Sequence, residues 1–221
     1  MIVDNMAHPI MSRTLFSLAK LWVKEVKGLD NLKKTNPFIV ACNHNSFADD
    51  LIMPAVVITY LNRYLYTYCN DGFYKNFFLR KFLENGRCIP VRVGQRNDES
   101  KKVNDNVFDM SLKLLRDKEL IAIFPEGHRS SDGELQKAKV GTARLALTAK
   151  TPVVPIGIVG SYEIMPKGSK FIKFKRCSVN IGEPVFFDKY YGQENNKKVL
   201  IEVTTKIMKE IGRLSGKEYR Y

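Results

Sequence analysis

Short apolar runs alternate with longer amphipathic segments along most of the chain. A run of apolar, often β-branched residues predicts a buried strand, and apolar residues at three- and four-residue intervals predict a helix. Strands are expected at residues 38–42, 64–68, 88–93, 120–124, 153–159, 178–181 and 185–187, and helices at 50–61, 73–83, 103–115, 141–148 and 199–214. This alternation is typical of an α/β fold with a central, mainly parallel sheet flanked by helices, in which functional loops follow the carboxyl ends of the strands.

The N-terminal segment shows a different pattern. From residue 11 to 26 apolar residues, Trp22 among them, recur at helical spacing, whereas Arg and Lys residues fall on the opposite side. A helix of this kind can lie in a membrane interface, where its basic side chains meet anionic headgroups, or it can pack on its own domain. We expect residues 1–27 to form an N-terminal amphipathic, membrane-associating helix and residues 28–221 to form one folded domain.

Composition narrows the class of protein. The chain has 221 residues, of which 44% are hydrophobic and 27% charged, so it can bury a core and is too apolar for a disordered chain. Its 36 Lys and Arg residues exceed its 23 Asp and Glu residues, which gives a net charge of +13. A charge of this sign attracts anionic lipid, nucleic acid or an acidic carrier protein, and charge alone does not choose among them.

Targeting and redox signals favour the cytosol. The longest apolar stretch, residues 51–61, is about half the roughly 20 residues needed to cross a bilayer, so we expect no membrane-spanning segment. Arg13 and Lys20 interrupt what would be the apolar core of a signal peptide. The four cysteines lie far apart without a CxxC pair, so we expect reduced cysteines and neither a zinc site nor a disulfide framework.

His44 is the first candidate for chemistry. It follows the predicted strand 38–42, and Asp49 comes five residues later, where the chain enters a predicted helix. An imidazole can take a proton at neutral pH, and a carboxylate on its other nitrogen fixes the tautomer and stabilises the imidazolium. Asp50 is an alternative partner. The same residues also fit a structural role, in which His44 is a core histidine and Asp49 or Ser46 caps the helix.

A second candidate site lies at residues 124–130, at the end of the predicted strand 120–124. Gly127 allows backbone N–H groups to approach a ligand, and Arg129 can hold a phosphate through paired, charge-assisted hydrogen bonds. The segment therefore predicts phosphate recognition. The structural alternative is a tight turn in which Glu126 and Arg129 form a local ion pair.

Together the two segments resemble sequence blocks of the glycerolipid acyltransferase superfamily, which contains the 1-acylglycerol-3-phosphate acyltransferases. The NHxSxxD block is matched by residues 43–49 and the FPEGTRS block by residues 124–130. Further matches are a glycine-to-arginine block at 86–92, a KxGxxxLA helix at 139–146 and an apolar VPVxP-like strand at 151–156. The resemblance covers roughly residues 26–184, and it fails at His128, where the family usually has threonine or serine.

The resemblance implies catalytic roles for two residues. His44 would be the general base, and Asp49 would hold its imidazole. The acceptor hydroxyl would attack an acyl thioester directly, so the resemblance implies no acyl-enzyme, no metal and no other cofactor. Residues 28–221 would then be the acyltransferase domain.

The resemblance also implies an acceptor-phosphate site. Its members would be Arg92, Glu126, Gly127 and Arg129. The expected reaction transfers an acyl chain from acyl-CoA or acyl carrier protein to the sn-2 hydroxyl of 1-acylglycerol-3-phosphate and gives phosphatidic acid. Because His128 departs from the block, another lysophospholipid or glycerol-3-phosphate is the alternative acceptor.

The expected partners follow from this reaction and from the net charge. They are the lysophospholipid acceptor, acyl-CoA or acyl carrier protein, and an anionic membrane surface, with no nucleic acid. The expected location is cytoplasmic and peripheral, at the inner face of the membrane.

Two other classes of function compete with an acyltransferase. A lipid hydrolase would use Ser46, Ser130 or Cys42 as a nucleophile, although the chain contains no GxSxG elbow. A nucleic-acid-binding protein would use the net charge and the aromatic and basic stretch 73–82. The helical periodicity of that stretch better fits a docked or membrane-facing helix.

Overall fold

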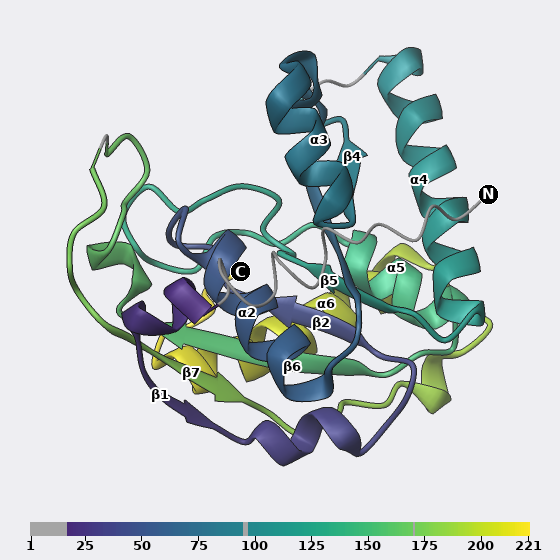
Figure 1. Ribbon diagram of the computed structural model, residues 1–221. Helices are drawn as coiled ribbons and strands as arrows, with labels where there is room; N and C mark the ends of the chain where they lie inside the picture. The colour runs from purple at the N-terminus through teal and green to yellow at the C-terminus, as the bar shows by residue number, and fades with distance from the viewer. Residues whose placement is uncertain (1–16, 95–96, 170) are drawn as a thin grey trace.

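A computed structural model describes residues 17–94, 97–169 and 171–221 (Figure 1). Within these residues the chain forms a seven-stranded sheet of order β1-β7-β6-β2-β5-β3-β4. The strands are β1 (Val23–Lys27), β2 (Ile39–Cys42), β3 (Leu65–Asn70), β4 (Cys88–Val91), β5 (Leu120–Ile123), β6 (Val153–Val159) and β7 (Cys177–Ile181). The five strands from β6 to β4 are parallel, β7 is antiparallel to β6, and β1 is parallel to β7. The prediction of a mainly parallel sheet is confirmed.

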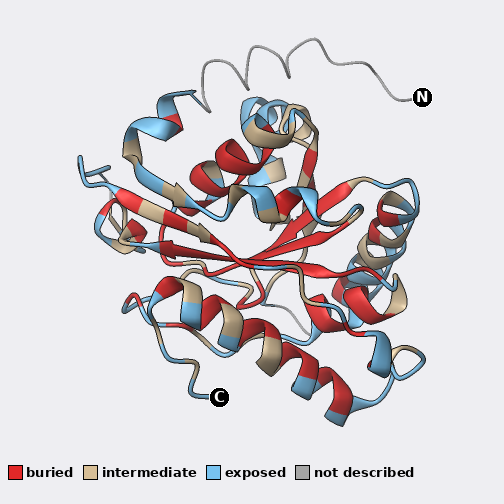
Figure 2. Cartoon of the chain, turned by 90° about the horizontal axis from the view of Figure 1, so that it is seen from below, coloured by how far each residue is buried: buried red, intermediate tan, exposed pale blue. Residues whose placement is uncertain are grey.

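Helices cover both faces of the sheet. The α-helices are α2 (Asp49–Leu61), α3 (Phe77–Asn85), α4 (Asp98–Arg116), α5 (Gly141–Thr148) and α6 (Lys197–Ser215). Short 3-10 helices are η1 (Lys20–Trp22), η2 (Leu29–Lys33), η3 (Asp71–Lys75), η4 (Ser161–Glu163) and η5 (Asp188–Tyr190). One buried cluster joins α2 to one face of the sheet, and a second joins α4, α5 and α6 to the other face. In Figure 2 the buried residues accordingly lie in the sheet and on the inward sides of the helices.

The central strands are apolar because both of their faces are covered. Every residue of β2 and β5 is buried, as in other parallel sheets with helices on both sides. Gly157 in β6 allows a close approach of α6, since a Cβ atom there would lie 2.4 Å from the backbone of Leu214. This packing fixes the carboxyl ends of the central strands relative to one another.

The N-terminal helix is shorter than its pattern predicts. Residues 17–22 are helical, but Val23–Lys27 form strand β1, so the prediction that the helix continues to Val26 is wrong. The first 16 residues of the predicted helix lie outside the described residues. The predicted boundary between the N-terminal helix and the folded domain lies at residue 27. Residues just before it form β1, which pairs with β7 and so belongs to the sheet of the domain.

Two other predicted elements differ in the structure. The predicted helix 73–83 is divided into η3 and α3, because Asn76 is extended and its side chain caps α3 by accepting a hydrogen bond from Leu79 N. The predicted strand 185–187 is wrong, since only an isolated bridge joins Val185 to Val153. Helix α3 has no buried residue and lies beside β4 at one end of the sheet (Figure 1).

Two further predictions concern membrane spans and cysteines. Within the described part of the chain no helix has the length and apolar character that crossing a bilayer requires. The four cysteines all lie in the described residues, and all four are free thiols.

Candidate active site

The two segments singled out in the sequence meet at one edge of the sheet. Residues 43–49 follow β2 and residues 124–130 follow β5, and these two parallel strands are hydrogen-bonded neighbours. The backbone N–H of Ser130 donates to the carbonyl oxygen of His44 at 2.8 Å. The backbone N–H of His44 in turn donates to Glu126 Oε1, also at 2.8 Å. The candidate base is therefore held by the loop that carries the candidate phosphate ligands.

The imidazole of His44 lies between two carboxylates. Its Nδ1 is 3.6 Å from Asp49 Oδ2, and its Nε2 is 3.9 Å from Asp50 Oδ1. The His44 side chain is 12% exposed and its ring stacks on Phe124, with ring centroids 4.0 Å apart. The Nδ1 side is thus buried, and solvent or a substrate can reach the ring only through its small exposed part.

Asp49 is the better fixed of the two carboxylates. Its side chain is fully buried, and its Oδ2 accepts hydrogen bonds from the backbone N–H groups of Asn45 (2.6 Å) and Ser46 (2.7 Å). The side chain of Asp50 is 41% exposed. Neither His44 Nδ1 nor Asp49 Oδ1 has a hydrogen-bond partner among the described residues, and Nδ1 lies 3.6 Å from Asp49 Oδ2, beyond hydrogen-bond distance. Long contacts of this kind are usual when no substrate is bound.

Asn43 fixes the loop from the opposite side. Its buried side chain donates to the carbonyl oxygen of Ile158 (3.0 Å) and accepts from the N–H of the same residue (2.8 Å), which lies in β6. Sequence reasoning gave Asn43 no role, although it is the first residue of the NHxSxxD match. The paired bonds hold the residue before His44 to the neighbouring strand.

Glu126 points into the protein. Its side chain is buried, Oε1 accepts from His44 N, and Oε2 accepts from Gln136 N at 2.7 Å. Burial raises the pKa of Glu126 from 4.5 to about 7, against the opposing effect of these two N–H donors. Each of its two oxygens is therefore occupied by a backbone N–H donor of the protein. This geometry argues against the expected direct contact with phosphate, and the expected ion pair with Arg129 is not formed.

Substitution of Glu126 by Gln should change how stability depends on pH. The folded protein holds this proton up to about pH 7 and the unfolded chain only to about pH 4.5, so folded molecules bind more protons between these values. The unfolding free energy of the wild type should therefore fall as pH rises through this window, by about 3 kcal/mol at most from this group. Glu126→Gln should be less stable than the wild type at pH 5, because its amide turns an N–H donor toward another donor. Urea unfolding should show that the difference in unfolding free energy between the wild type and Glu126→Gln disappears by pH 8.

The matched control is Glu163→Gln, since Glu163 is an exposed carboxylate. Its stability relative to the wild type should be the same at both pH values. If the difference in unfolding free energy between the wild type and Glu126→Gln widens from pH 5 to pH 8, then burial is not the main influence on the pKa of Glu126.

Gly127 and Lys139 lie in contact. Gly127 has φ +72°, a conformation that favours glycine, and a Cβ atom there would lie 2.9 Å from Lys139 Nζ. The backbone N–H of Lys139 also donates to the carbonyl oxygen of Pro125 at 2.8 Å. Lys139 forms no ion pair among the described residues. The structure therefore adds an ammonium group that sequence reasoning noted only as the first residue of the KxGxxxLA match.

Arg129 lies on the His44 side of the second loop. Its guanidinium carbon is 5.5 Å from the ring centroid of Phe47, which belongs to the loop that carries His44. Within the described part of the chain Arg129 has no carboxylate partner within ion-pair distance. The neighbouring His128 is exposed, with Nδ1 3.3 Å from the carbonyl oxygen of Arg129. A free guanidinium beside the candidate base can receive an anionic group.

Arg92 lies farther along the sheet. It follows β4, and the strand order separates β4 from β2 by β5 and β3, which amounts to about 14 Å between the strand backbones. Arg92 Nε is 2.7 Å from Asp71 Oδ2, and its Nη1 is 2.7 Å from Glu99 Oε1. These two carboxylates would have to release the guanidinium before it could bind a phosphate. The structure does not bring Arg92 together with the residues around His44.

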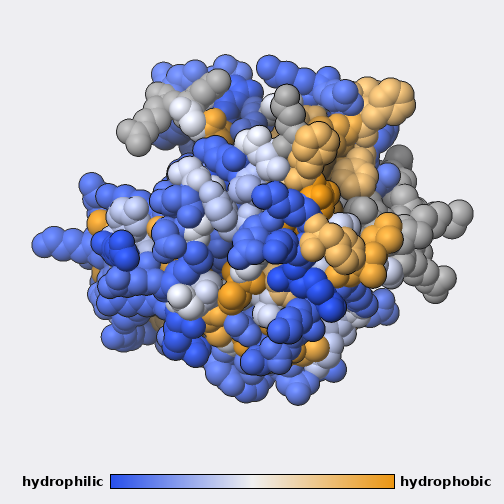
Figure 3. All heavy atoms as spheres, turned by 90° about the vertical axis from the view of Figure 1, so that its left-hand side faces the viewer, coloured by the Kyte–Doolittle hydropathy of each residue, from blue (hydrophilic) through white to orange (hydrophobic). Residues whose placement is uncertain are grey.

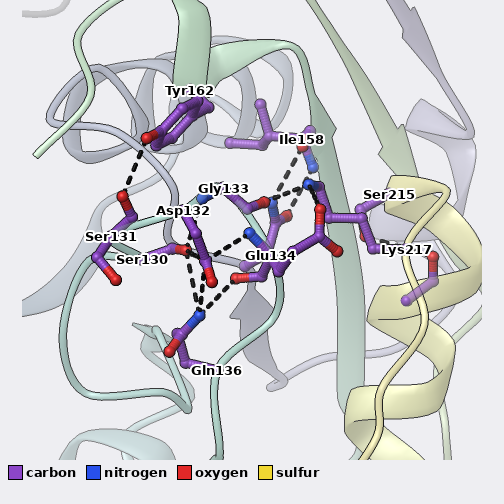
Figure 4. Close-up of polar contacts among 12 residues, drawn as sticks. Ser130, Ser131, Asp132, Gly133, Glu134, Gln136, Ile158, Tyr162, Ser215 and Lys217 are labelled. Atoms are coloured by element: carbon purple, nitrogen blue, oxygen red, sulfur yellow. Dashed lines mark hydrogen bonds and ion pairs between the residues drawn. The ribbon is translucent and has the colours of Figure 1, made fainter.

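The side chains that a hydrolase would need as nucleophiles are already engaged. Ser46 Oγ donates to the carbonyl oxygen of Met165 (2.9 Å), and Ser130 Oγ donates to Asp132 Oδ1 (2.9 Å). Figure 4 shows Ser130 turned toward Asp132 and Gln136. Burial raises the pKa of the Cys42 thiol well above its usual value. None of the three is activated by His44.

A metal ion in a protein needs several His, Cys, Asp or Glu side chains close together, here within residues 17–94, 97–169 and 171–221. No group of three or more His, Cys, Asp or Glu side chains in these ranges could hold a metal ion. What the site presents is a buried carboxylate and imidazole pair with cationic groups beside it. Such a pair can accept a proton from a hydroxyl while the cations attract an anion.

Comparison with known proteins identifies the family of the chain. A model of the family described as "Acyltransferase" matches residues 24–159. The 1-acyl-sn-glycerol-3-phosphate acyltransferase of Bacillus subtilis is 26% identical over 161 residues, which are 73% of each chain. The chloroplastic 1-acyl-sn-glycerol-3-phosphate acyltransferase BAT2 of Brassica napus is 26% identical over 183 residues, which are 78% of this chain and 50% of that protein.

A solved structure shares the fold. The crystal structure of the 1-acyl-sn-glycerophosphate (LPA) acyltransferase PlsC from Thermotoga maritima aligns with a TM-score of 0.68 at 21% identity, over 96% of this chain and 84% of that one. The family match covers more than half of the chain and includes both loops of the site. The chain therefore belongs to the acyltransferase family of enzymes.

Proposed function

We propose that the protein transfers an acyl chain from a thioester donor to the sn-2 hydroxyl of 1-acylglycerol-3-phosphate, giving phosphatidic acid for phospholipid biosynthesis. The observation that carries the proposal is the position of His44. Its Nδ1 faces the buried Asp49, and its ring lies beside the loop that carries Arg129. The relatives named above bear the same activity in their names.

In the proposed reaction His44 is the general base. With Nδ1 protonated and turned toward Asp49, Nε2 takes the proton of the acceptor hydroxyl as its oxygen attacks the thioester carbonyl carbon. A tetrahedral oxyanion forms and collapses, the C–S bond breaks, and the thiolate takes the proton from His44. The products are the ester and the free thiol, and Asp49 stabilises the imidazolium between the two proton transfers.

The acceptor phosphate is proposed to bind at Gly127, Arg129 and Lys139. The two side chains supply cations without carboxylate partners, and the missing Cβ of Gly127 leaves room for the Lys139 side chain. Glu126 then has a positioning role, since its carboxylate joins His44 to the loop of Gln136. Arg92 retains the role that the family resemblance implies only if Asp71 and Glu99 release it.

The donor is proposed to be acyl-CoA or acyl carrier protein. No cofactor is needed, because the C–S bond that breaks and the C–O bond that forms involve only atoms of the two substrates. A net charge of +13 suits an acidic carrier and an anionic membrane surface alike. We therefore propose that the enzyme works peripherally at the inner face of the membrane. His128, in the loop of residues 124–130, is exposed. Because this residue departs from the family block, another lysophospholipid or glycerol-3-phosphate is the alternative acceptor.

The experiment that tests this function presents the purified full chain with a panel of donors and acceptors. Acyl-CoA and acyl carrier protein are combined with 1-acylglycerol-3-phosphate, glycerol-3-phosphate and phosphate-free lysolipids, and the products are identified by mass spectrometry. Phosphatidic acid should be the main product. Esterification of a different acceptor would move the function to the alternative, and release of free fatty acid without ester formation would favour a hydrolase.

A further inference from the structure

Exposed apolar side chains gather on the loop between β6 and β7. In this loop the side chains of Phe171, Ile172 and Phe174 are 79%, 52% and 80% exposed. The helical residues Leu18 and Leu21 are 53% and 52% exposed. We call these five residues the apolar patch. Figure 3 views the side of the molecule that bears the loop, and hydrophobic side chains gather along one margin of that otherwise mainly hydrophilic face.

The two parts of the patch lie against each other. The ring centroids of Trp22 and Phe174 are 6.4 Å apart, and Arg176 Nη2 donates to the carbonyl oxygen of Val23 at 2.8 Å. A groove of about 320 Å³ between the two segments is lined by Lys20, Leu21, Phe174 and Arg176. Two of these lining residues are apolar and two are cationic.

The patch is joined to the candidate active site through the same loop. The loop leaves the carboxyl end of β6, the strand beside β2, so it begins at the edge of the sheet where His44 lies. The carbonyl oxygen of Met165 accepts hydrogen bonds from Ser46 Oγ (2.9 Å) and from Phe47 N (3.3 Å). A surface that receives the patch would thus lie next to the loop that carries the candidate base.

The two segments that carry the patch contain basic residues and no acidic ones. Residues 164–176 contain five basic residues and no acidic one, and residues 17–22 contain no acidic residue either. Lys20, Lys173, Lys175 and Arg176 are all exposed. Large apolar side chains ringed by basic ones suit the boundary between acyl chains and anionic headgroups, where both kinds of group are satisfied at once.

We propose that the apolar patch is a docking surface for an anionic phospholipid bilayer, with Phe171, Ile172 and Phe174 entering the acyl-chain region and the basic residues contacting headgroups. The proposal deepens the proposed function, because it assigns the surface through which a lipid acceptor leaves the bilayer for His44. It differs from the sequence-based expectation of a membrane helix, since most of the patch belongs to the loop between β6 and β7.

Trp22 makes docking directly measurable. It is the one tryptophan of the chain, and it lies beside Phe174. The full-length protein is mixed at low salt with vesicles of phosphatidylcholine alone or of phosphatidylcholine with phosphatidylglycerol, and bound protein is measured by sedimentation. Vesicles whose acyl chains carry bromine report the depth of the patch, because bromine quenches tryptophan fluorescence at short range.

The test variant replaces both Phe171 and Phe174 by Ser, and the matched control is Phe186→Ser. Phe186 is 57% exposed, but it follows Val185, which bridges to Val153 at the amino end of β6 and therefore at the opposite edge of the sheet. The wild type should bind anionic vesicles and be quenched by brominated chains. The double variant should bind at least tenfold more weakly, since it lacks the two aromatic side chains proposed to enter the acyl-chain region, and the control should stay within about twofold of the wild type.

A second variant tests the charge. Replacing Lys173 and Lys175 by Glu should remove the preference for anionic over zwitterionic vesicles. Equal binding by the wild type and the Phe171 and Phe174 double variant would overturn the proposal. So would a dimer in analytical ultracentrifugation that the double variant converts to a monomer, or salt-sensitive RNA binding that requires these two residues, since either would assign the patch to a different partner.

Turnover of a short-chain, monomeric acceptor separates this proposal from the proposed function. The double variant should keep this turnover, because it leaves unchanged the Met165 carbonyl oxygen through which this loop contacts Ser46 and Phe47. If the wild type binds vesicles through the patch but acylates no lysolipid, then the proposed function fails and the docking surface stands.

Discussion

His44→Ala should lower kcat by roughly 10²- to 10⁴-fold, which is the usual contribution of a positioned general base. The loss follows from the position of the imidazole, whose Nδ1 faces the fully buried Asp49 and whose Nε2 is the proposed proton acceptor. The fold should survive, because the hydrogen bonds that anchor this residue to Glu126 and Ser130 come from its backbone. The measurement is single-turnover acyl transfer on a protein whose circular dichroism and melting temperature match the wild type.

Two aspartates provide the matched pair of controls. Asp49→Asn should lose activity to a similar degree, because a neutral amide cannot stabilise an imidazolium, while its carbonyl oxygen can still accept from the N–H groups of Asn45 and Ser46 and so keep the fold. Asp50→Asn should lose less than about tenfold, since this side chain is 41% exposed and not fixed by backbone donors. A folded His44→Ala protein with near-normal turnover would remove His44 from the mechanism. Equal losses in Asp49→Asn and Asp50→Asn would show that the two carboxylates share the orienting role.

The fold was largely predictable because its central strands are buried on both faces. Such strands are continuous apolar runs, and β2, β5 and β6 are therefore evident in the sequence. Edge strand β1 was not evident in the sequence, and the register of its pairing with β7 explains why. An irregularity in its pairing with β7 between Val23 and Glu25 lets both Val23 and Val26 pack on the core, so a strand has the three-residue spacing that normally indicates a helix.

The candidate site was predictable only in part. The sequence predicts that each of the two segments follows a buried strand, which the structure confirms, and the pairing of these two strands is known from the structure alone. The direction of Glu126 could not be read from the sequence, because a carboxylate after a strand can face solvent or the backbone of a neighbouring loop. The position of the Lys139 side chain could not be predicted either. It depends on the left-handed turn at Gly127, which leaves the space that this side chain fills.

Arg129→Ala should chiefly weaken use of a phosphate-bearing acceptor. A hydrogen bond to a charged group contributes about 1.5 to 3 kcal/mol, so loss of one bond should lower kcat/KM for the acceptor about 10- to 100-fold, and loss of two should lower it further. The donor KM should hardly change. Arg129→Lys should rescue only part of the loss, because an ammonium keeps the charge but lacks the bidentate geometry of the guanidinium.

Lys139→Gln and His128→Thr complete the comparison. Lys139→Gln should also discriminate against the phosphate-bearing acceptor, since it removes the ammonium that lies over Gly127. His128→Thr restores the residue usual in the family and tests whether the exposed imidazole selects another headgroup. All variants are assayed with phosphate-bearing and phosphate-free lysolipids. If wild type, Arg129→Ala and Lys139→Gln prefer the phosphate-bearing acceptor to the same extent, then neither cation recognises the phosphate. A changed headgroup preference in His128→Thr alone would then assign acceptor recognition to His128.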